Sequence, residues 1–224
     1  MTPLLIFDLD GTLIDSAADL HAAINRLLAE LDRPPLPLDQ VTRMIGDGVA
    51  KLVERALAAT SDGKPTDSAQ ATARFLALYE ADPVRFTHAY AGVPETLRSL
   101  SDAGYRMAIA TNKPERAAAD ILGHLGLASF FTAVLGGDSL PVRKPDPAML
   151  TTLLDRFETI PARAILIGDS EVDMATAVAA GIPAILMTYG YRRGPVETIA
   201  CAAALDRFKH IPETLLRLGL PADR

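Results

Sequence analysis

The sequence predicts an α/β protein: a doubly wound, Rossmann-like parallel sheet with a small α-helical domain inserted after the first strand. Three observations predict this architecture. Short apolar runs recur along the chain, helical patterns lie between most of them, and one long segment near the amino terminus has helical periodicity alone. Alternating strands and helices are typical of a sheet covered by helices on both faces.

The expected strands are short runs of apolar residues rather than alternating apolar and polar ones. Strands of a parallel sheet have this composition because helices bury both of its faces. The runs lie at residues 4–9, 106–111, 133–135, 164–167 and 184–188.

Helical segments with recognisable ends lie between the later strands. Each ends at or near a glycine, the residue that most easily adopts the left-handed conformation after a helix. These segments are residues 94–103, 114–124 and 172–180. The alternation predicts βαβ units, and ligands of such sheets bind at the carboxyl ends of the strands.

Residues 16–86 break the alternation, because they contain helical periodicity and no convincing strand. Residues 21–31, for example, place leucine and isoleucine on one side of a helix. Residues 49–59 and 69–81 show similar patterns. We therefore expect a catalytic core made of residues 1–15 and 87–224, and a separate helical domain at 16–86 that stands over the strand ends like a lid.

Composition excludes several classes of partner. The formal net charge is −6, from 22 Lys and Arg against 28 Asp and Glu, and the basic residues are scattered. No large basic surface for nucleic acid is expected. The single cysteine, Cys201, cannot form an intramolecular disulfide, which favours a reducing compartment. No leader-like start or bilayer-length apolar run is present, so we expect a cytoplasmic protein with no membrane partner.

Two strand ends carry acidic pairs. Asp8 lies near the end of the first run and Asp10 directly follows it, and Asp169 and Asp173 follow the run at 164–167. Carboxylates at a buried strand end are costly unless something neutralises them. A hard divalent cation such as Mg²⁺ does so with oxygen ligands. Asp169 alone could be an ordinary helix cap, but that does not explain the matching pair on the first strand.

Two further elements suit a bound anion. Thr111 and Asn112 end the strand at 106–111, just before a helix that starts with proline, and Lys144 is framed by prolines in a short loop. Taken singly, Thr111 could be a helix cap and Lys144 a surface lysine. Together with the acidic pairs they suit phosphoryl transfer, in which positioning and neutralising the phosphoryl oxygens dominate the barrier. Because the sequence shows no competent Ser–His or Cys–His set, a carboxylate is the simplest nucleophile.

These elements, in this order, resemble the motifs of the haloacid dehalogenase superfamily across essentially the whole chain. The inserted helices resemble its α-helical cap. The resemblance implies that Asp8 attacks phosphorus, that Asp10 protonates the leaving group and then activates water, and that Thr111 and Lys144 hold phosphoryl oxygens. It also implies Mg²⁺ bound by the Asp8 side chain, the Asp10 main-chain carbonyl and Asp169, with support from Asp173.

Within the superfamily, the acid at Asp10 and the threonine at Thr12 resemble phosphatases rather than dehalogenases, phosphonate-cleaving enzymes or sugar-phosphate mutases. The segments 45–48, 51–57, 111–114, 136–138 and 186–191 are similar to those of bacterial phosphoglycolate phosphatases. The resemblance implies hydrolysis of 2-phosphoglycolate, a small phosphate monoester, to glycolate. That subgroup usually has asparagine where Asp47 stands, and an extra carboxylate there could repel an anionic substrate.

Substrate choice is expected to depend on the loop of the helical insertion. The loop glycines, Gly46 and Gly48, allow close approach of the backbone to a ligand, and either Arg43 or Lys51 could meet the substrate carboxylate. The ordinary alternative for both bases is a solvated helix face. Thr12 and Asn112 complete the expected substrate contacts.

Two other functions stay open on the sequence alone. A broader sugar-phosphate or nucleotide phosphatase would use the same core residues. A phosphate-binding module without turnover would need no acid–base group, so the presence of Asp10 argues against it. Either a monomer or a homodimer is compatible with the sequence.

Overall fold

The computed structural model describes residues 2–61, 63 and 66–222. It confirms the predicted α/β fold, with a parallel six-stranded sheet in the strand order β5-β4-β1-β6-β7-β8. The strands are β1 (Leu4–Phe7), β4 (Arg106–Ala110), β5 (Ala133–Leu135), β6 (Ala164–Gly168), β7 (Ala184–Met187) and β8 (Ala203–Leu205). A separate two-stranded antiparallel ladder joins β2 (Ile14–Asp15) to β3 (His88–Ala89).

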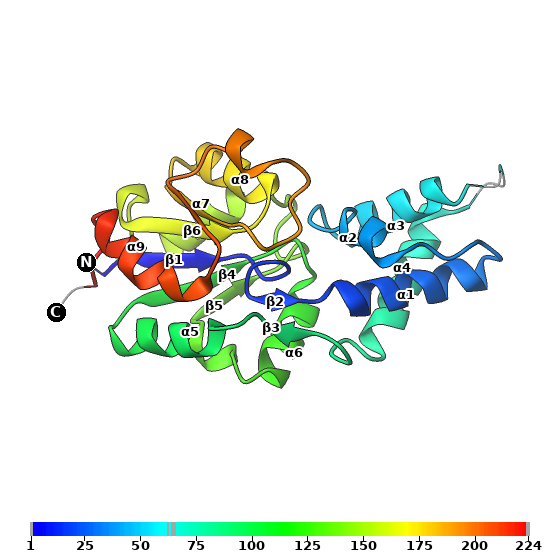
Figure 1. Cartoon of the computed structure of the whole chain (residues 1–224), viewed down its shortest axis with the longest axis horizontal. Coiled ribbons are helices and arrows are strands. Elements are labelled where there is room, and N and C mark those ends of the chain that lie inside the picture. The colour runs from blue at the N-terminus through cyan, green and yellow to red at the C-terminus, as the bar shows by residue number, and fades with distance from the viewer. Residues whose placement is uncertain (1, 62, 64–65, 223–224) are drawn as a thin grey trace.

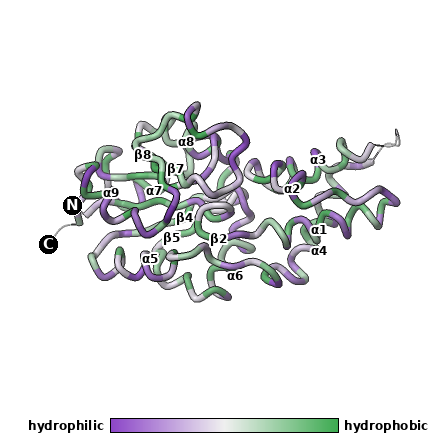
Figure 2. Tube along the Cα trace, viewed as in Figure 1, coloured by the Kyte–Doolittle hydropathy of each residue, from purple (hydrophilic) through white to green (hydrophobic). Residues whose placement is uncertain are grey.

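Helices cover both faces of the sheet, as its apolar strands require. Alternate residues of a strand point to opposite faces, so Leu5 and Phe7 belong to one buried cluster while Leu4 and Ile6 belong to another. The first cluster contains residues of α5 (Val93–Asp102), α6 (Glu115–His124) and α9 (Ile211–Arg217). The second contains residues of α7 (Ala148–Arg156) and α8 (Glu171–Ala180). In Figure 2 the strands in the middle of the sheet are coloured as hydrophobic.

The inserted segment contains the three helices that its periodicity predicts and one short helix more. The predicted ones are α1 (Ala17–Glu30), α3 (Val49–Ala59) and α4 (Ser68–Glu80), and the additional one is α2 (Leu38–Thr42). Their apolar faces pack together, with Leu27, Val53 and Phe75 almost fully buried. Figure 1 shows these helices standing at one end of the sheet, beyond the carboxyl end of β1.

The paired part of the first strand is shorter than its apolar run, since β1 ends at Phe7 rather than at Leu9. After Phe7 the Asp8 amide still donates to the Ile167 carbonyl, and the chain then turns at Gly11, where φ is +84°. Strand β8 and helices α2, α7 and α9 were not predicted. Strand β8 and helices α2 and α9 are too short to show a clear periodicity. Helix α7 directly follows the proline-rich loop around Lys144.

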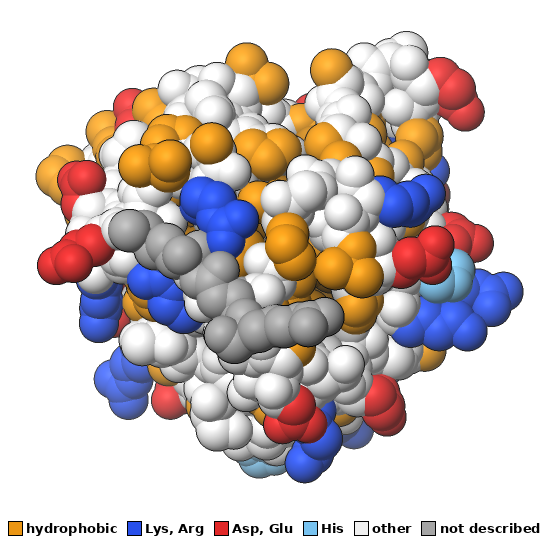
Figure 3. Space-filling model, turned by 90° about the vertical axis from the view of Figure 1, so that its left-hand side faces the viewer, with side chains coloured by type: hydrophobic (Ala, Val, Ile, Leu, Met, Phe, Trp, Pro, Cys, Tyr) orange, Lys and Arg blue, Asp and Glu red, His pale blue; other side chains and the backbone are white. Residues whose placement is uncertain are grey.

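The other end of the sheet carries the amino end of β1 and the last helix, α9 (Figure 1). That end faces the viewer in Figure 3, where acidic and basic side chains are interspersed with apolar ones. None of the described helices is long and apolar enough to cross a membrane. The strand ends that carry the acidic residues lie at the opposite edge of the sheet, next to the inserted helices (Figure 1).

Candidate active site

The predicted motifs meet because their strands are neighbours. Strand β1 pairs with β4 on one side, placing Phe7 beside Ile109, and with β6 on the other, placing Phe7 beside Ile167. Parallel strands end at the same edge of a sheet, so the residues that follow β1, β4 and β6 converge there. Asp8, Thr111 and Asp169 are those residues, and all three are buried.

Three buried carboxylates form a cluster at this edge. Asp8, Asp169 and Asp173 each offer an oxygen, and these oxygens lie within 4.8 Å of one another. Burial, together with the charge of Asp173, raises the pKa of Asp8 to about 6, although Lys144 opposes the shift. Burial and the charges of Asp173 and Asp8 also raise the pKa of Asp169 well above its usual range. A set of three crowded oxygen ligands with excess negative charge fits a hard divalent cation.

The backbone and a hydroxyl hold Asp169 in place. The Thr12 hydroxyl donates to Oδ1 of Asp169 at 2.9 Å, and the Tyr191 amide donates to Oδ2 at 2.6 Å. A Cβ at Gly11 or Gly190 would lie 2.3 Å or 2.2 Å from Oδ2, so only glycine leaves room for this carboxylate. Thr12, predicted to bind substrate, contacts the carboxylate cluster through this hydrogen bond.

Asp173 has a structural role as well as a place in the cluster. It is the third residue of α8, and it forms a capping box with the N-cap residue Ser170. Its Oδ2 accepts hydrogen bonds from the Ser170 hydroxyl at 2.6 Å and from the Asp169 amide at 3.2 Å. Its Oδ1 accepts from Lys144 at 2.6 Å. The start of α8 thus fixes one wall of the cluster.

Lys144 is a buried cation within this acidic site. Its ammonium nitrogen lies 2.9 Å from Oδ1 of Asp8 and 2.6 Å from Oδ1 of Asp173. Burial alone would lower the pKa of Lys144, but the charges of Asp173 and Asp8 outweigh it and raise the pKa above its ordinary value. The Asn112 side chain donates to the Lys144 carbonyl at 3.0 Å and so ties this loop to the end of β4.

Asp10 lies beside the cluster and has different partners. The Ser16 hydroxyl donates to Oδ1 of Asp10 at 2.5 Å. The Lys113 ammonium donates to both carboxylate oxygens, at 3.1 Å and 3.2 Å. Burial opposes the charge of Lys113, but Asp10 and Tyr79 outweigh burial and raise its pKa. Lys113 and Ser16 were not predicted as site residues, although Lys113 directly follows Thr111 and Asn112 in the strand-end motif.

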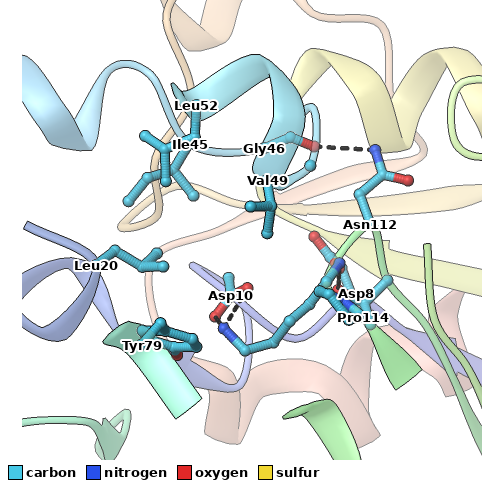
Figure 4. A pocket seen from close by; sticks show the side chains of 13 residues that line it. Asp8, Asp10, Leu20, Ile45, Gly46, Val49, Leu52, Tyr79, Asn112 and Pro114 are labelled. Atoms are coloured by element: carbon cyan, nitrogen blue, oxygen red, sulfur yellow. Dashed lines mark hydrogen bonds and ion pairs between the residues drawn. The ribbon is translucent and has the colours of Figure 1, made fainter. Parts of the chain in front are cut away.

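A cavity lies between the sheet edge and the inserted helices (Figure 4). The core side of its lining combines acidic, polar and basic residues, whereas the other side is mostly aliphatic. The core residues are Asp8, Asp10, Thr111, Asn112, Lys113 and Pro114. The inserted segment contributes Leu20, Ile45, Gly46, Gly48, Val49, Leu52 and Tyr79.

The structure separates the predicted loop residues into two groups. Gly46 and Gly48 line the cavity, and the Gly46 carbonyl accepts a hydrogen bond from Asn112 at 3.0 Å. Arg43 and Lys51 do not line it. Arg43 forms an exposed ion pair with Asp39, and Lys51 forms one with Glu54.

Asp47 is neutralised by arginines from both parts of the chain. Arg55 of α3 pairs with its Oδ2 at 2.5 Å, and Arg193, which follows β7, contacts the same oxygen. Burial alone would raise the pKa of Asp47, but the hydrogen bonds from Arg193 and Arg55 outweigh it and lower the pKa. Arg193 also donates to the carbonyls of Ile45 at 3.0 Å and Arg43 at 3.1 Å. The extra carboxylate is therefore part of a contact between the core and the loop at residues 43–48.

Comparison with known proteins agrees with this geometry. The family model of haloacid dehalogenase-like hydrolases matches residues 5–187. A phosphoglycolate phosphatase of Cereibacter sphaeroides (strain ATCC 17029 / ATH 2.4.9) is 44% identical over 219 residues, covering 96% of this chain and 99% of the relative. A phosphoglycolate phosphatase of Rhodospirillum rubrum is 43% identical over 220 residues, covering 96% of this chain and 91% of the relative.

Solved structures share the whole architecture. The crystal structure of a "predicted phosphoglycolate phosphatase" from Haemophilus somnus 129pt has a TM-score of 0.91 and 32% identity, with coverage of 95% of this chain and 97% of that one. The crystal structure of a "predicted phosphatase" from Clostridium acetobutylicum has a TM-score of 0.84 at 23% identity, covering 97% of this chain and 99% of that one. The second likeness supports the fold.

Proposed function

This chain belongs to the haloacid dehalogenase-like hydrolase family and is a phosphoric monoester hydrolase, and we propose that it hydrolyses 2-phosphoglycolate to glycolate and phosphate with Asp8 as the nucleophile. One observation supports the nucleophile assignment above the others. Among the described residues, Asp8 is the one member of the carboxylate cluster that also lines the cavity. It is therefore placed to contact both a cation and a substrate.

The first step transfers the phosphoryl group to the protein. A carboxylate oxygen of Asp8 attacks phosphorus, the bond from phosphorus to the glycolate oxygen breaks, and its electron pair stays on that oxygen. Asp10 lines the same cavity two residues further on and donates a proton to the departing oxygen. The result is an aspartyl phosphate at Asp8 and free glycolate.

The second step regenerates Asp8. The Asp10 carboxylate accepts a proton from water, and the resulting hydroxide attacks phosphorus. The bond from phosphorus to the Asp8 oxygen breaks, its electron pair returns to the Asp8 carboxylate, and inorganic phosphate is released. Ser16 and Lys113 orient the Asp10 carboxylate through the contacts described above. The aliphatic wall of Leu20, Val49 and Leu52 limits access of bulk water to the reacting atoms.

The phosphoryl oxygens are held by Thr111 and Lys144, with Asn112 positioning the loop that carries Lys144. A divalent cation, which we propose to be Mg²⁺, would be held by the side chains of Asp8 and Asp169 and by the main-chain carbonyl of Asp10, with Asp173 in support. When bound, the cation supplies positive charge that stabilises the negative phosphoryl group. The three buried carboxylates of the cluster support this assignment.

Residues 16–86 are proposed to act as a cap domain over this site. Helices α1–α4 pack against one another, and residues of α1, α3, α4 and the loop before α3 form the wall of the cavity that faces the sheet edge. Arg193 and Asn112 of the core contact the loop at residues 43–48. We propose that this loop positions the substrate when the cap is closed. A cytoplasmic location and a monomeric or homodimeric state stay predictions from the sequence.

The test is a substrate panel with the purified protein and Mg²⁺. The values of kcat/KM are measured for 2-phosphoglycolate, ribose 5-phosphate, glucose 6-phosphate and adenosine monophosphate. We expect a preference for 2-phosphoglycolate of at least about 100-fold, loss of activity with EDTA, and recovery with Mg²⁺. Asp8→Asn should be inactive, whereas Asp206→Asn, at an exposed aspartate, should match the parent.

Each alternative has its own outcome. A sugar phosphate preferred by two orders of magnitude would contradict the substrate but leave the mechanism intact. Activity that EDTA does not change would contradict the cation site. A folded protein that hydrolyses none of these esters, nor p-nitrophenyl phosphate, would instead be a phosphate-binding module.

A further inference from the structure

Lys113 is the one cationic side chain among the described residues that line the cavity. Only 3% of its side chain is exposed. An ammonium group has three donors, and the two contacts with Asp10 use at most two of them. A buried lysine that faces the substrate cavity therefore keeps capacity for a further anionic partner.

The proposed substrate has a second anionic group that the phosphoryl site does not use. In 2-phosphoglycolate a carboxylate is separated from the phosphate by one methylene group, so both anions enter the same cavity. Lys144 and the carboxylate cluster lie at the phosphoryl end. On the inserted side the wall is mostly aliphatic, from Leu20, Ile45, Val49 and Leu52, and an unpaired carboxylate against such a surface is costly.

Tyr79 supplies a second polar group in the same place. This residue of α4 is 3% exposed and lines the cavity. Its buried hydroxyl forms no hydrogen bond of ordinary geometry with the described residues, although the nearby Lys113 ammonium interacts with it electrostatically. The Lys113 ammonium lies over its ring, 4.6 Å from the ring centroid. Figure 4 shows Tyr79 beside Asp10, across the cavity from Val49. A buried hydroxyl that no well-formed hydrogen bond satisfies, next to a buried cation, indicates a ligand that accepts hydrogen bonds.

The two basic residues that the sequence offered for the substrate carboxylate, Arg43 and Lys51, do not reach the cavity in the structure. Arg43 and Lys51 are exposed, paired with Asp39 and Glu54, and absent from the cavity lining. Arg193 and Arg55 are paired with Asp47.

We propose that Lys113 and Tyr79 form the subsite that binds the substrate carboxylate and so determine specificity for carboxylated phosphate esters. This inference rests on the proposed function. It joins one residue of the core to one residue of the inserted helices, so a bound carboxylate would contact both parts of the chain. Smaller esters without a carboxylate would still reach Asp8 but would leave Lys113 and Tyr79 without their ligand.

The test compares two substrates of similar size: 2-phosphoglycolate and 2-hydroxyethyl phosphate, in which a hydroxymethyl group replaces the carboxylate. Their kcat/KM values are measured for the parent, Lys113→Met, Tyr79→Phe and the control Lys209→Met, at an exposed lysine. We expect Lys113→Met to lower the ratio of the two values about 100-fold and Tyr79→Phe to lower it about 10-fold. Lys209→Met should leave it unchanged.

The ratio of the two kcat/KM values distinguishes binding of the substrate carboxylate from an effect that acts through Asp10. Both substrates need Asp10, so a loss that acts only through Asp10 would lower both values equally and overturn the inference. An unchanged ratio in both variants would also overturn it. If Lys113→Met does not fold, Tyr79→Phe decides, because it keeps the ring. The parent protein tests the proposed function separately: a parent that prefers 2-hydroxyethyl phosphate would refute it. The ratios of the variants test only the carboxylate subsite.

Discussion

The ammonium nitrogen of Lys144 lies 2.9 Å from Oδ1 of Asp8. The same nitrogen lies 2.6 Å from Asp173, so one buried lysine compensates two of the three clustered carboxylates. The site is therefore a balance of buried charges, and its stability should depend on each of them.

Removing the lysine should destabilise the protein strongly. Lys144→Met leaves Asp8 and Asp173 without their cation, and breaking a buried pair in this way typically costs about 3–5 kcal/mol. Urea unfolding in EDTA measures the loss of free energy of unfolding, and added Mg²⁺ should recover part of it. Lys209→Met, at the surface, should change stability by less than about 0.5 kcal/mol. Equal stability of the two variants would contradict the charge balance.

The raised pKa of Asp8 predicts a pH-dependent stability without metal. With a pKa of about 6 against an ordinary 3.8, the folded state holds more protons than the unfolded state between these values. Stability from this group is therefore lost as the pH rises from about 4 to about 6. Asp8→Asn removes the effect, so its stability relative to the parent should increase over this range, by at most about 3 kcal/mol.

Urea unfolding of both proteins in EDTA at pH 4.5, 5.5 and 7.5 measures this difference. Above pH 6 the difference should be constant. A difference that does not change with pH, or that decreases as the pH rises, would show that Asp8 is not a carboxyl with a raised pKa.

The close contact at Asp169 predicts a sharp effect of a single methyl group. Gly190→Ala would place a Cβ 2.2 Å from Oδ2 of Asp169, so the carboxylate must move. We expect Mg²⁺ affinity to fall at least about 10-fold, and activity at saturating Mg²⁺ to fall about 100-fold. Gly123→Ala, where a Cβ meets nothing within 4 Å, is the matched control and should behave as the parent. Normal Mg²⁺ affinity in Gly190→Ala would argue against Asp169 as a ligand.

The contacts of Arg193 with the loop at residues 43–48 predict that two variants, Arg193→Met and Asp47→Asn, affect activity to different extents. Arg193→Met removes the donor to Asp47 and to the Ile45 and Arg43 carbonyls. It should raise KM for 2-phosphoglycolate about 10-fold, because the loop is no longer held at the core. Asp47→Asn removes a charge that is already neutralised, so kcat/KM should change less than about threefold. A large gain in Asp47→Asn would mean that Asp47 does repel the substrate.

The sequence predicted the core of the site because each motif is local. An apolar run followed by carboxylates places Asp8 and Asp169 at strand ends, and a parallel sheet brings those ends to one edge. The carboxylate cluster could therefore be predicted from the strand ends, without knowledge of individual side-chain contacts. Helical periodicity likewise located α1, α3 and α4, because their apolar stripes pack together.

Contacts between distant loops could not be predicted in the same way. The Tyr191 amide reaches Asp169 across 22 positions, and Arg193 reaches Asp47 across 146. The Tyr191 contact is made by a backbone amide, which no side-chain pattern can reveal, and Arg193 follows no local pattern that distinguishes it from a surface residue. Lys113 was adjacent to a recognised motif, but only its burial against Asp10 and Tyr79 reveals that it faces the cavity.

The most direct test of the mechanism is to identify the residue that carries the phosphoryl group. Protein mixed with 2-phosphoglycolate and Mg²⁺ is quenched in acid and treated with borohydride, which reduces an aspartyl phosphate to homoserine, and the peptides are analysed by mass spectrometry. The account predicts homoserine at position 8, and none at that position when substrate is omitted. Homoserine at another aspartate, or full turnover by Asp8→Asn, would contradict it.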